Sequence, residues 1–181
     1  MNRVNLMTSA TASGDSKALL GQIQSAFGTV PAMFQAVANS PAGLRSMWGG
    51  FGALAGGKLS GKLKEQLAVA IADRNDCEYC LAAHTALGRK AGASAEEISE
   101  AQAGRSADPQ AAAALQFALK IVERRAQLDD ADFAALRRAG FDDETIVEII
   151  AHVALNLFTN YVNVALRVPV DFPAVKLRKS A

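Results

Sequence analysis

The chain has 181 residues, of which 50% are hydrophobic, 20% charged and 6% aromatic, and its formal net charge is +1. This length favours one domain, and the near-zero charge excludes the basic footprint of a nucleic-acid-binding protein. The longest apolar stretches, 67–72 and 149–155, fall well short of the roughly 18 residues of a membrane span. The N-terminal sequence MNRVNLMTSATASGDS lacks the hydrophobic core of a signal peptide, which predicts a cytoplasmic protein without a membrane partner.

The composition favours helices throughout. Alanine, the best helix former, occupies 37 positions, and the stretches between the five prolines lack the alternation typical of strands. Apolar residues recur at helical spacing over about 15–27, 32–38, 41–54, 61–75, 77–91, 95–103, 109–127, 129–139 and 143–167. We therefore expect an all-α fold, a bundle of about eight helices in one domain over 15–170. An irregular arm, 1–14, precedes this domain, and a solvated tail, 171–181, follows it.

Several helix starts are marked by side chains that accept hydrogen bonds from free backbone N–H groups. These predicted capping residues are Ser60, Asp76, Ser94, Asp108 and Asp142. Ser94 is followed three residues later by Glu97, the pattern of a capping box. Asp76 is expected to begin a helix directly after the preceding one ends, which would place Cys77 in its first turn.

The two cysteines of the chain share a helical segment with a histidine. Cys77, Cys80 and His84 stand at i, i+3 and i+7, so they are expected on one face of one helix. The helix start favours a thiolate at Cys77, and a neutral imidazole at His84 could take the proton of Cys80. A Cys-x-x-Cys pair can also close a disulfide within one turn, so that one sulfur attacks and the other resolves.

Three plainer interpretations compete with this one. Free cysteines are often small core residues. Cys77, Cys80 and His84, with Glu65 or His152 as a fourth ligand, could instead bind zinc, although structural zinc usually takes paired ligands from separated knuckles. Glu65 taken alone would be a solvated residue of a lysine-rich helix start. If the two helices around position 75 pack antiparallel, however, Glu65 and His84 come to the same depth beside each other.

The pattern Glu-x11-Cys-x2-Cys-x3-His resembles the alkylhydroperoxidase AhpD-like family of the carboxymuconolactone decarboxylase superfamily. The resemblance covers about 31–92 and includes the lead-in VPAMFQAVANSPAGLRSMW. The later segments NYVN, 160–163, and VDFP, 170–173, resemble a longer, peroxidase-related subgroup. Two features depart from the family. Tyr79 stands where the best-known members have histidine, and the cysteine pair argues against the lactone decarboxylation that named the superfamily.

The resemblance implies an AhpD-like helical bundle, assembled as a trimer or hexamer, that reduces hydroperoxides through a reversible Cys77–Cys80 disulfide. It also implies a proton relay from Glu65 and His84, with Cys80 attacking and Cys77 resolving, whereas the residues alone favour Cys77 as the thiolate. No bound cofactor or metal is expected, only an external lipoyl or thioredoxin-like thiol reductant. The other function classes considered are a redox sensor and a decarboxylase-like member that has kept the cysteines.

A polar stripe is predicted on the last helix. His152, Asn156, Asn160 and Asn163 recur at helical spacing, although asparagine is a poor helix former. They are expected either to hydrogen-bond neighbouring helix ends or a second subunit, or to line the site. Tyr79, His152 and Asn156 are accordingly candidates for supporting the four site residues Glu65, Cys77, Cys80 and His84.

Overall fold

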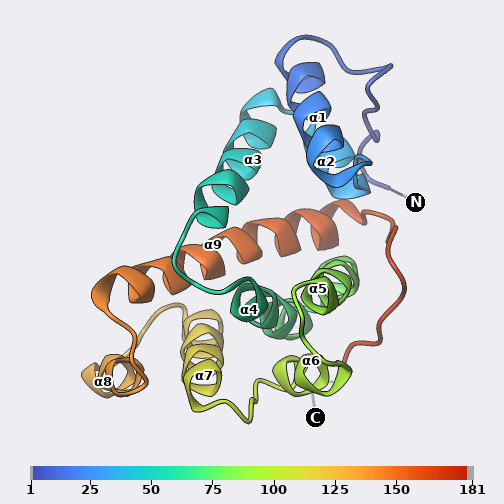
Figure 1. The fold of residues 1–181 in the computed structure, drawn as a ribbon. Helices are drawn as coiled ribbons and strands as arrows, with labels where there is room; N and C mark the ends of the chain where they lie inside the picture. The colour runs from blue at the N-terminus through green and yellow to red at the C-terminus, as the bar shows by residue number, and fades with distance from the viewer. Residues whose placement is uncertain (1, 179–181) are drawn as a thin grey trace.

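The long last helix is the centre of the fold. A computed structural model of the chain describes residues 2–178, and over that range it contains nine helices, eight of them with seven or more residues, and no strands. In chain order they are α1 (Gly14–Phe27), α2 (Ala32–Val37), α3 (Pro41–Ala55), α4 (Gly61–Arg74), α5 (Glu78–Lys90), α6 (Ala95–Gln102), α7 (Pro109–Arg124), α8 (Asp130–Arg138) and α9 (Asp143–Leu166). Helices α1–α3 lie on one side of α9, and α4–α8 lie on the other (Figure 1). The all-α prediction is confirmed.

Most of the predicted helix starts are formed by the expected side chains. Ser60, Ser94, Asp108 and Asp142 each accept a hydrogen bond from a backbone N–H of the helix that follows. The Ser94–Glu97 capping box is complete. These caps set where α4, α6, α7 and α9 begin, because each satisfies one of the backbone donors that a helix leaves unpaired.

The predicted cap at Asp76 is wrong. The N-cap of α5 is Cys77, whose Sγ accepts from the backbone N–H of Cys80, and the helix begins at Glu78. Asp76 instead takes a left-handed conformation (φ 51°) at the end of α4. There the N–H of Cys77 reaches the carbonyl of Ala72 at 2.9 Å and the N–H of Asp76 reaches that of Asp73 at 3.2 Å. This pair of bonds is a Schellman motif, so Asp76 ends α4 and fixes Cys77 in a tight turn.

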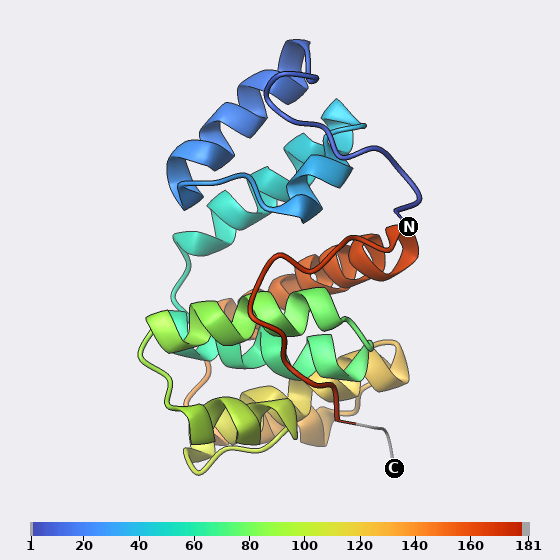
Figure 2. The ribbon, with the colours of Figure 1, turned by 90° about the vertical axis from the view of Figure 1, so that its right-hand side faces the viewer.

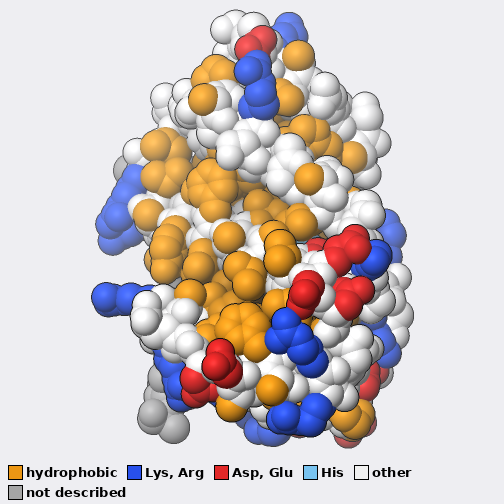
Figure 3. All heavy atoms as spheres, turned by 90° about the vertical axis from the view of Figure 1, so that its left-hand side faces the viewer, with side chains coloured by type: hydrophobic (Ala, Val, Ile, Leu, Met, Phe, Trp, Pro, Cys, Tyr) orange, Lys and Arg blue, Asp and Glu red, His pale blue; other side chains and the backbone are white. Residues whose placement is uncertain are grey.

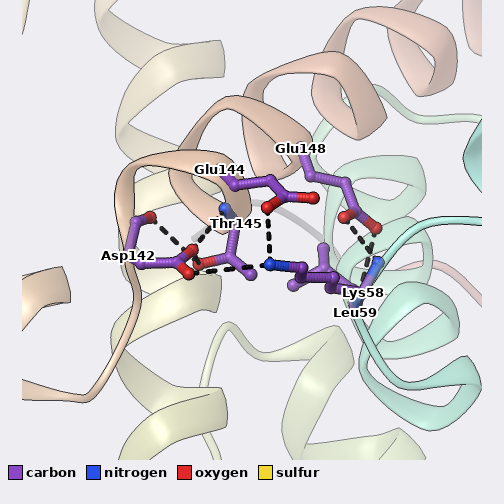
Figure 4. A network of polar contacts seen from close by, with 6 residues as sticks. All are labelled: Lys58, Leu59, Asp142, Glu144, Thr145 and Glu148. Atoms are coloured by element: carbon purple, nitrogen blue, oxygen red, sulfur yellow. Dashed lines mark hydrogen bonds and ion pairs between the residues drawn. The ribbon is translucent and has the colours of Figure 1, made fainter.

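A buried carboxylate anchors the loop that leads into α4. Glu148 of α9 accepts the backbone N–H groups of Lys58 and Leu59 at 2.7 and 3.1 Å (Figure 4). On the surface beside it, the ammonium group of Lys58 pairs with Glu144 at 2.5 Å. The loop between α3 and α4 is thereby tied to α9, which fixes the position of α4.

Replacing Gly57 with alanine is expected to destabilise the protein by about 2 kcal/mol, because it disrupts charge-assisted hydrogen bonds. A Cβ at position 57 would lie 2.2 Å from Oε1 of Glu148, so the carboxylate would have to leave its two backbone donors. Chemical denaturation checks this, with Gly56→Ala as the control because a Cβ there meets only a carbonyl oxygen at 3.7 Å. Equal midpoints for the two variants would contradict the anchoring role of Glu148.

The C-terminal segment 171–178 is held along the fold: Phe172, Val175 and Leu177 pack against the core, while its other residues are exposed, as expected for a tail. Residues 179–181 lie outside the described part. Figure 2 shows this segment running across α5 toward α6. Asp171 accepts from the backbone N–H of Ala32 at 2.7 Å, and the N–H of Arg178 reaches Asp73 at 2.9 Å. The aromatic ring of Phe172 stacks edge-on against Tyr79, with centroids 5.7 Å apart. These contacts hold the segment beside the cysteine helix.

Helix α9 departs from the expectation that no segment is long and apolar enough to span a membrane. By length and composition it is long and apolar enough to cross a membrane, with a mean hydropathy of 1.4 over an 18-residue window. Polar residues interrupt its apolar stretches, so no uninterrupted apolar run in the sequence indicates it. A mostly buried core helix meets the same criterion; 39% of this window is buried, and α9 buries the polar side chains His152, Asn156, Asn160 and Asn163.

Candidate active site

The two cysteines lie buried at the start of α5. Cys77 is 1% exposed and Cys80 is 2% exposed, and both are free thiols. The Sγ of Cys77 lies 3.3 Å from the backbone nitrogen of Cys80, which donates to it. Cys77 is therefore the capping residue, and Cys80 occupies the first turn of the helix. The backbone places the two sulfur-bearing residues one turn apart in a site shielded from bulk water.

Glu65 and His84 meet across the α4–α5 pair. Nδ1 of His84 lies 2.7 Å from Oε2 of Glu65, and both side chains are largely buried. The antiparallel packing expected from the sequence brings these turns together. Gly88, one turn beyond His84, permits the close approach of α6 to α5, because a Cβ there would lie 2.6 Å from Cδ1 of Ile98; the same Cβ would lie 3.4 Å from Cβ of Glu65.

The surroundings of the two thiols separate their acidities. The thiol of Cys77 hydrogen-bonds the Cys80 sulfur and lowers its pKa to about 6; burial opposes this shift, and the neighbouring His84 supports it. The pKa of Cys77 is raised, first by the same hydrogen bond and then by burial. These surroundings favour Cys80 as the thiolate of the pair, because the Cys77 thiol donates a hydrogen bond to the Cys80 sulfur. Residue order alone favours Cys77 instead, since it stands nearer the helix start.

The surroundings of the His84 imidazole favour its charged form. Burial lowers the pKa of His84, but the carboxylate of Glu65 and the Cys80 sulfur outweigh burial and raise it overall. An imidazolium next to a thiolate is a familiar way to activate a cysteine, because each charge stabilises the other. The Glu65–His84 contact can therefore store the proton that Cys80 releases.

An apolar cavity of about 50 Å³ adjoins Cys80 and His84. Its wall is built mainly from aromatic and aliphatic side chains, namely Phe27, Pro31, Met33, Phe34, Phe51, Ala83, Leu87 and Phe172. Tyr79 closes one side, and its hydroxyl accepts from the backbone N–H of Met33 at 3.3 Å. Burial raises the pKa of Tyr79, so it stays neutral and serves as wall rather than as a base.

A second cavity, of about 280 Å³, adjoins Cys77. It is more polar, and its lining includes Glu78, Asn163 and Arg167. The two sulfur atoms are therefore approached from different spaces: Cys80 lines the apolar cavity, and Cys77 lines the polar one.

A third cavity, of about 390 Å³, lies on the other side of the Glu65–His84 pair. His152 and Asn156, two residues predicted to support the site, line this space rather than touching the cysteines. The side-chain amide of Asn156 donates to the carbonyl of His152 at 2.8 Å. Burial lowers the pKa of His152, so its ring is neutral, and its Nε2 has no hydrogen-bond partner among residues 2–178. The Glu65–His84 pair thus separates an apolar space from a partly polar one.

Sequence reasoning missed several contacts that come from distant parts of the chain. Asn163 donates from Nδ2 to the Sγ of Cys80 at 3.1 Å, and Asn75 donates to Oδ1 of Asn160 at 2.9 Å. Phe172, in the segment expected to be solvated, lines the apolar cavity. The only signals in the sequence were the polar stripe on the last helix and the NYVN and VDFP segments, which point to no particular partner.

The zinc alternative finds no geometric support in the part of the chain that the structure describes. Within residues 2–178, no three His, Cys, Asp or Glu side chains converge as a metal site would require. The ring of His84 is directed through Nδ1 to Glu65. The cysteine pair, His84 and Glu65 therefore form a candidate thiol redox site.

The fold and this site define an all-α protein with a buried Cys-x-x-Cys pair and a Glu–His partner. Residues 44–124, which contain all four of these side chains, match the carboxymuconolactone decarboxylase family. Over residues 44–124 the chain is similar to this family, and its fold is AhpD-like. No curated protein matches the chain significantly.

Solved structures extend the likeness to nearly the whole chain. An uncharacterized peroxidase-related protein with an alkylhydroperoxidase AhpD core, from Ralstonia eutropha JMP134, is 27% identical with a TM-score of 0.85, over 94% of this chain and 92% of that one. An uncharacterized peroxidase-related protein from Silicibacter sp. TM1040 is 25% identical with a TM-score of 0.80, over 93% and 91%. The debrominase Bmp8 is 21% identical with a TM-score of 0.74, over 86% of each chain, a likeness of fold alone.

Proposed function

We propose that this protein is a thiol-dependent hydroperoxide reductase that cycles Cys77 and Cys80 between dithiol and disulfide. The observation that carries the proposal is the low-pKa sulfur of Cys80, which lies between the Cys77 thiol and the charged His84–Glu65 pair at the wall of an apolar cavity. The likeness to peroxidase-related proteins supports it.

The chemistry follows from these positions. The Cys80 thiolate attacks one oxygen of the hydroperoxide, the O–O bond breaks, and the leaving alkoxide takes a proton from the His84 imidazolium to give an alcohol. The Cys80 sulfenic acid then condenses with the Cys77 thiol, which releases water and forms the disulfide. An external dithiol, lipoyl or thioredoxin-like, reduces that disulfide by thiol exchange and is itself oxidised. No bound cofactor takes part.

The separate cavities at the two sulfur atoms support these different roles for Cys80 and Cys77. The apolar cavity at Cys80 suits the organic part of a hydroperoxide, while the polar cavity at Cys77 offers a separate approach for the reductant. In exchange, the reductant thiolate attacks Cys77, and the more acidic Cys80 is the better leaving thiol.

The test is to mix reduced protein with an organic hydroperoxide and dihydrolipoamide and to follow peroxide loss against the protein thiol titre. Many peroxides consumed per chain are expected. A single stoichiometric oxidation, accompanied by a change in particle size, would instead identify the redox sensor considered as the alternative. No oxidation of the cysteine pair would exclude both.

We also infer that the protein assembles as a homo-oligomer, a trimer or hexamer. Large apolar side chains are exposed along α9, among them Val147 at 64%, Tyr161 at 61% and Val164 at 48%. Figure 3, which looks onto the side of the molecule where α9 begins, shows hydrophobic side chains gathered across the middle of that face. A surface of this kind is typical of an interface between subunits.

Light scattering of the purified protein is expected to give a multiple of the 19.0 kDa chain mass at micromolar concentration. Val147→Glu places a charge in the exposed apolar stretch and should reduce the particle size. A wild-type particle of 19.0 kDa would contradict the assembly.

A further inference from the structure

The last helix places two buried asparagines near the Cys80 sulfur, and one of them, Asn163, contacts it directly. We propose that Asn163 and Asn160 form an amide site that holds this sulfur in its anionic form, first as the thiolate and then as the sulfenate, and so select Cys80 over Cys77 for attack. This inference rests on the proposed function for the sulfenate step only. The thiolate step stands independently of any substrate.

The contact of Asn163 is direct. Its Nδ2 lies 3.1 Å from Sγ of Cys80, and the residue is only 3% exposed. An amide N–H aimed at a sulfur in a water-excluded site favours the anion, because the donor stabilises the charged form without itself carrying charge. The Cys77 sulfur accepts from the backbone N–H of Cys80, and the Asn163 amide favours its anion too, but the hydrogen bond to Cys80 and burial outweigh both and raise the pKa of Cys77.

Asn160 supplies the second amide. It is 0% exposed, and its Oδ1 accepts a hydrogen bond from Asn75 at the end of α4. This bond fixes the orientation of the amide group, including its Nδ2. Its Nδ2 has no hydrogen-bond partner in the described part of the chain. The Asn160 amide lies near enough to Cys80 to help lower its pKa, although its Nδ2 does not reach the sulfur in hydrogen-bonding geometry. A buried donor left unpaired costs about 1–3 kcal/mol, so one kept beside a reactive sulfur indicates an acceptor that is present in another state of the site. The oxygen that the sulfur gains from a hydroperoxide is such an acceptor.

Few titratable groups other than these amides' neighbours on α5 surround the Cys80 sulfur. The titratable groups that face Cys80 are Cys77 and His84 on α5, with Glu65 of α4 behind His84 and the neutral Tyr79 beside them. Helix α9 faces the sulfur with its two amides, and α2 contributes uncharged side chains to the same cavity. The amides of α9 therefore act together with His84 of α5.

The experiment measures the pKa of Cys80 by alkylation with iodoacetamide across pH, with the labelled peptide identified by mass spectrometry. Asn163→Leu is similar in size and lacks the donor. It is expected to raise the pKa of Cys80 by about 1–2 units, which corresponds to one lost hydrogen bond to a charged group. Asn163→Ala avoids any overpacking and should give a shift in the same direction. Adding Asn160→Ala should raise the pKa further.

Asn156→Leu is the matched control, because this residue is buried on the same helix and donates to the carbonyl of His152. It should leave the pKa of Cys80 unchanged. An unchanged pKa in folded Asn163→Leu and Asn163→Ala would overturn the proposal, even in a protein that turns over peroxide. A raised pKa in a protein without peroxide turnover would uphold the amide site as a thiolate site and refute the proposed function.

The sulfenate step has its own readout. In a Cys77→Ser background, one equivalent of cumene hydroperoxide should leave Cys80 as a sulfenic acid that dimedone traps. Asn160→Ala in that background is expected to shorten the lifetime of this species several-fold, because the sulfenate loses its donor. An equal lifetime in the presence and absence of Asn160 would limit the amide site to the thiolate.

Discussion

Cys80→Ser is expected to abolish dithiol-supported peroxide reduction, with a fall of at least about 1,000-fold, because the variant lacks the nucleophile itself. Serine keeps the size of the side chain, and Cys80 sits within a helix whose cap is supplied by Cys77. The fold should therefore survive, as circular dichroism can check. Turnover is measured as peroxide loss in the presence of dihydrolipoamide.

Cys77→Ser separates attack from resolution. The thiolate of Cys80 remains, so one peroxide per chain should still be reduced, after which the reaction stops at the sulfenic acid. Mass spectrometry should show the gain of one oxygen atom in this variant and the loss of two hydrogen atoms in the oxidised wild type. The serine hydroxyl at position 77 still donates a hydrogen bond to the Cys80 sulfur. The contact that lowers the pKa of Cys80 is therefore kept.

Full turnover in both single variants would contradict the disulfide cycle. One stoichiometric reduction by Cys80→Ser, together with none by Cys77→Ser, would reverse the roles of the two sulfurs. The two variants therefore test the assignment of the thiolate as well as the need for a pair.

Local sequence signals predicted the helices well because each acts within a few residues. The caps at Ser60, Ser94, Asp108 and Asp142 depend only on a side chain and the backbone that follows it. The Glu65–His84 contact could also be anticipated, since a short turn between two helices fixes their relative depth.

The failures have physical reasons of two kinds. At Asp76 two local roles compete, and the end of α4 prevails over the start of α5 because the Schellman bonds require a residue with positive φ there. The contacts of Asn163, Asp171 and Phe172 depend on where distant segments dock, which no local pattern encodes. The side of the site that comes from α9 and the C-terminal segment was therefore not predictable from spacing.

The second large effect concerns the proton relay of Glu65 and His84. The direction of the expected pKa change follows from how Glu65 acts on His84 and His84 acts on Cys80. Glu65 raises the pKa of His84, and the charged ring in turn supports the thiolate of Cys80, whose pKa is about 6. Glu65→Gln keeps the shape and removes the charge, so the pKa of His84 should fall and that of Cys80 should rise toward the ordinary thiol value. The thiolate is the form present above the Cys80 pKa, and its alkylation profile must therefore move to higher pH.

For Glu65→Gln we expect the midpoint of the Cys80 alkylation profile to move up by about one pH unit, which reduces the thiolate fraction at pH 7 about twofold. For His84→Ala we expect it to move up by about two units, which reduces the thiolate fraction at pH 7 about tenfold. The midpoint of iodoacetamide alkylation is the measure, because the nucleophilicity of a thiolate rises with its pKa and partly offsets the change in rate. Glu97→Gln serves as the matched control, since Glu97 pairs with Lys62 at 2.7 Å on the surface. Superimposable profiles for wild type, Glu65→Gln and His84→Ala would mean that the amides of α9 and the Cys77 thiol alone hold the Cys80 sulfur in its charged form.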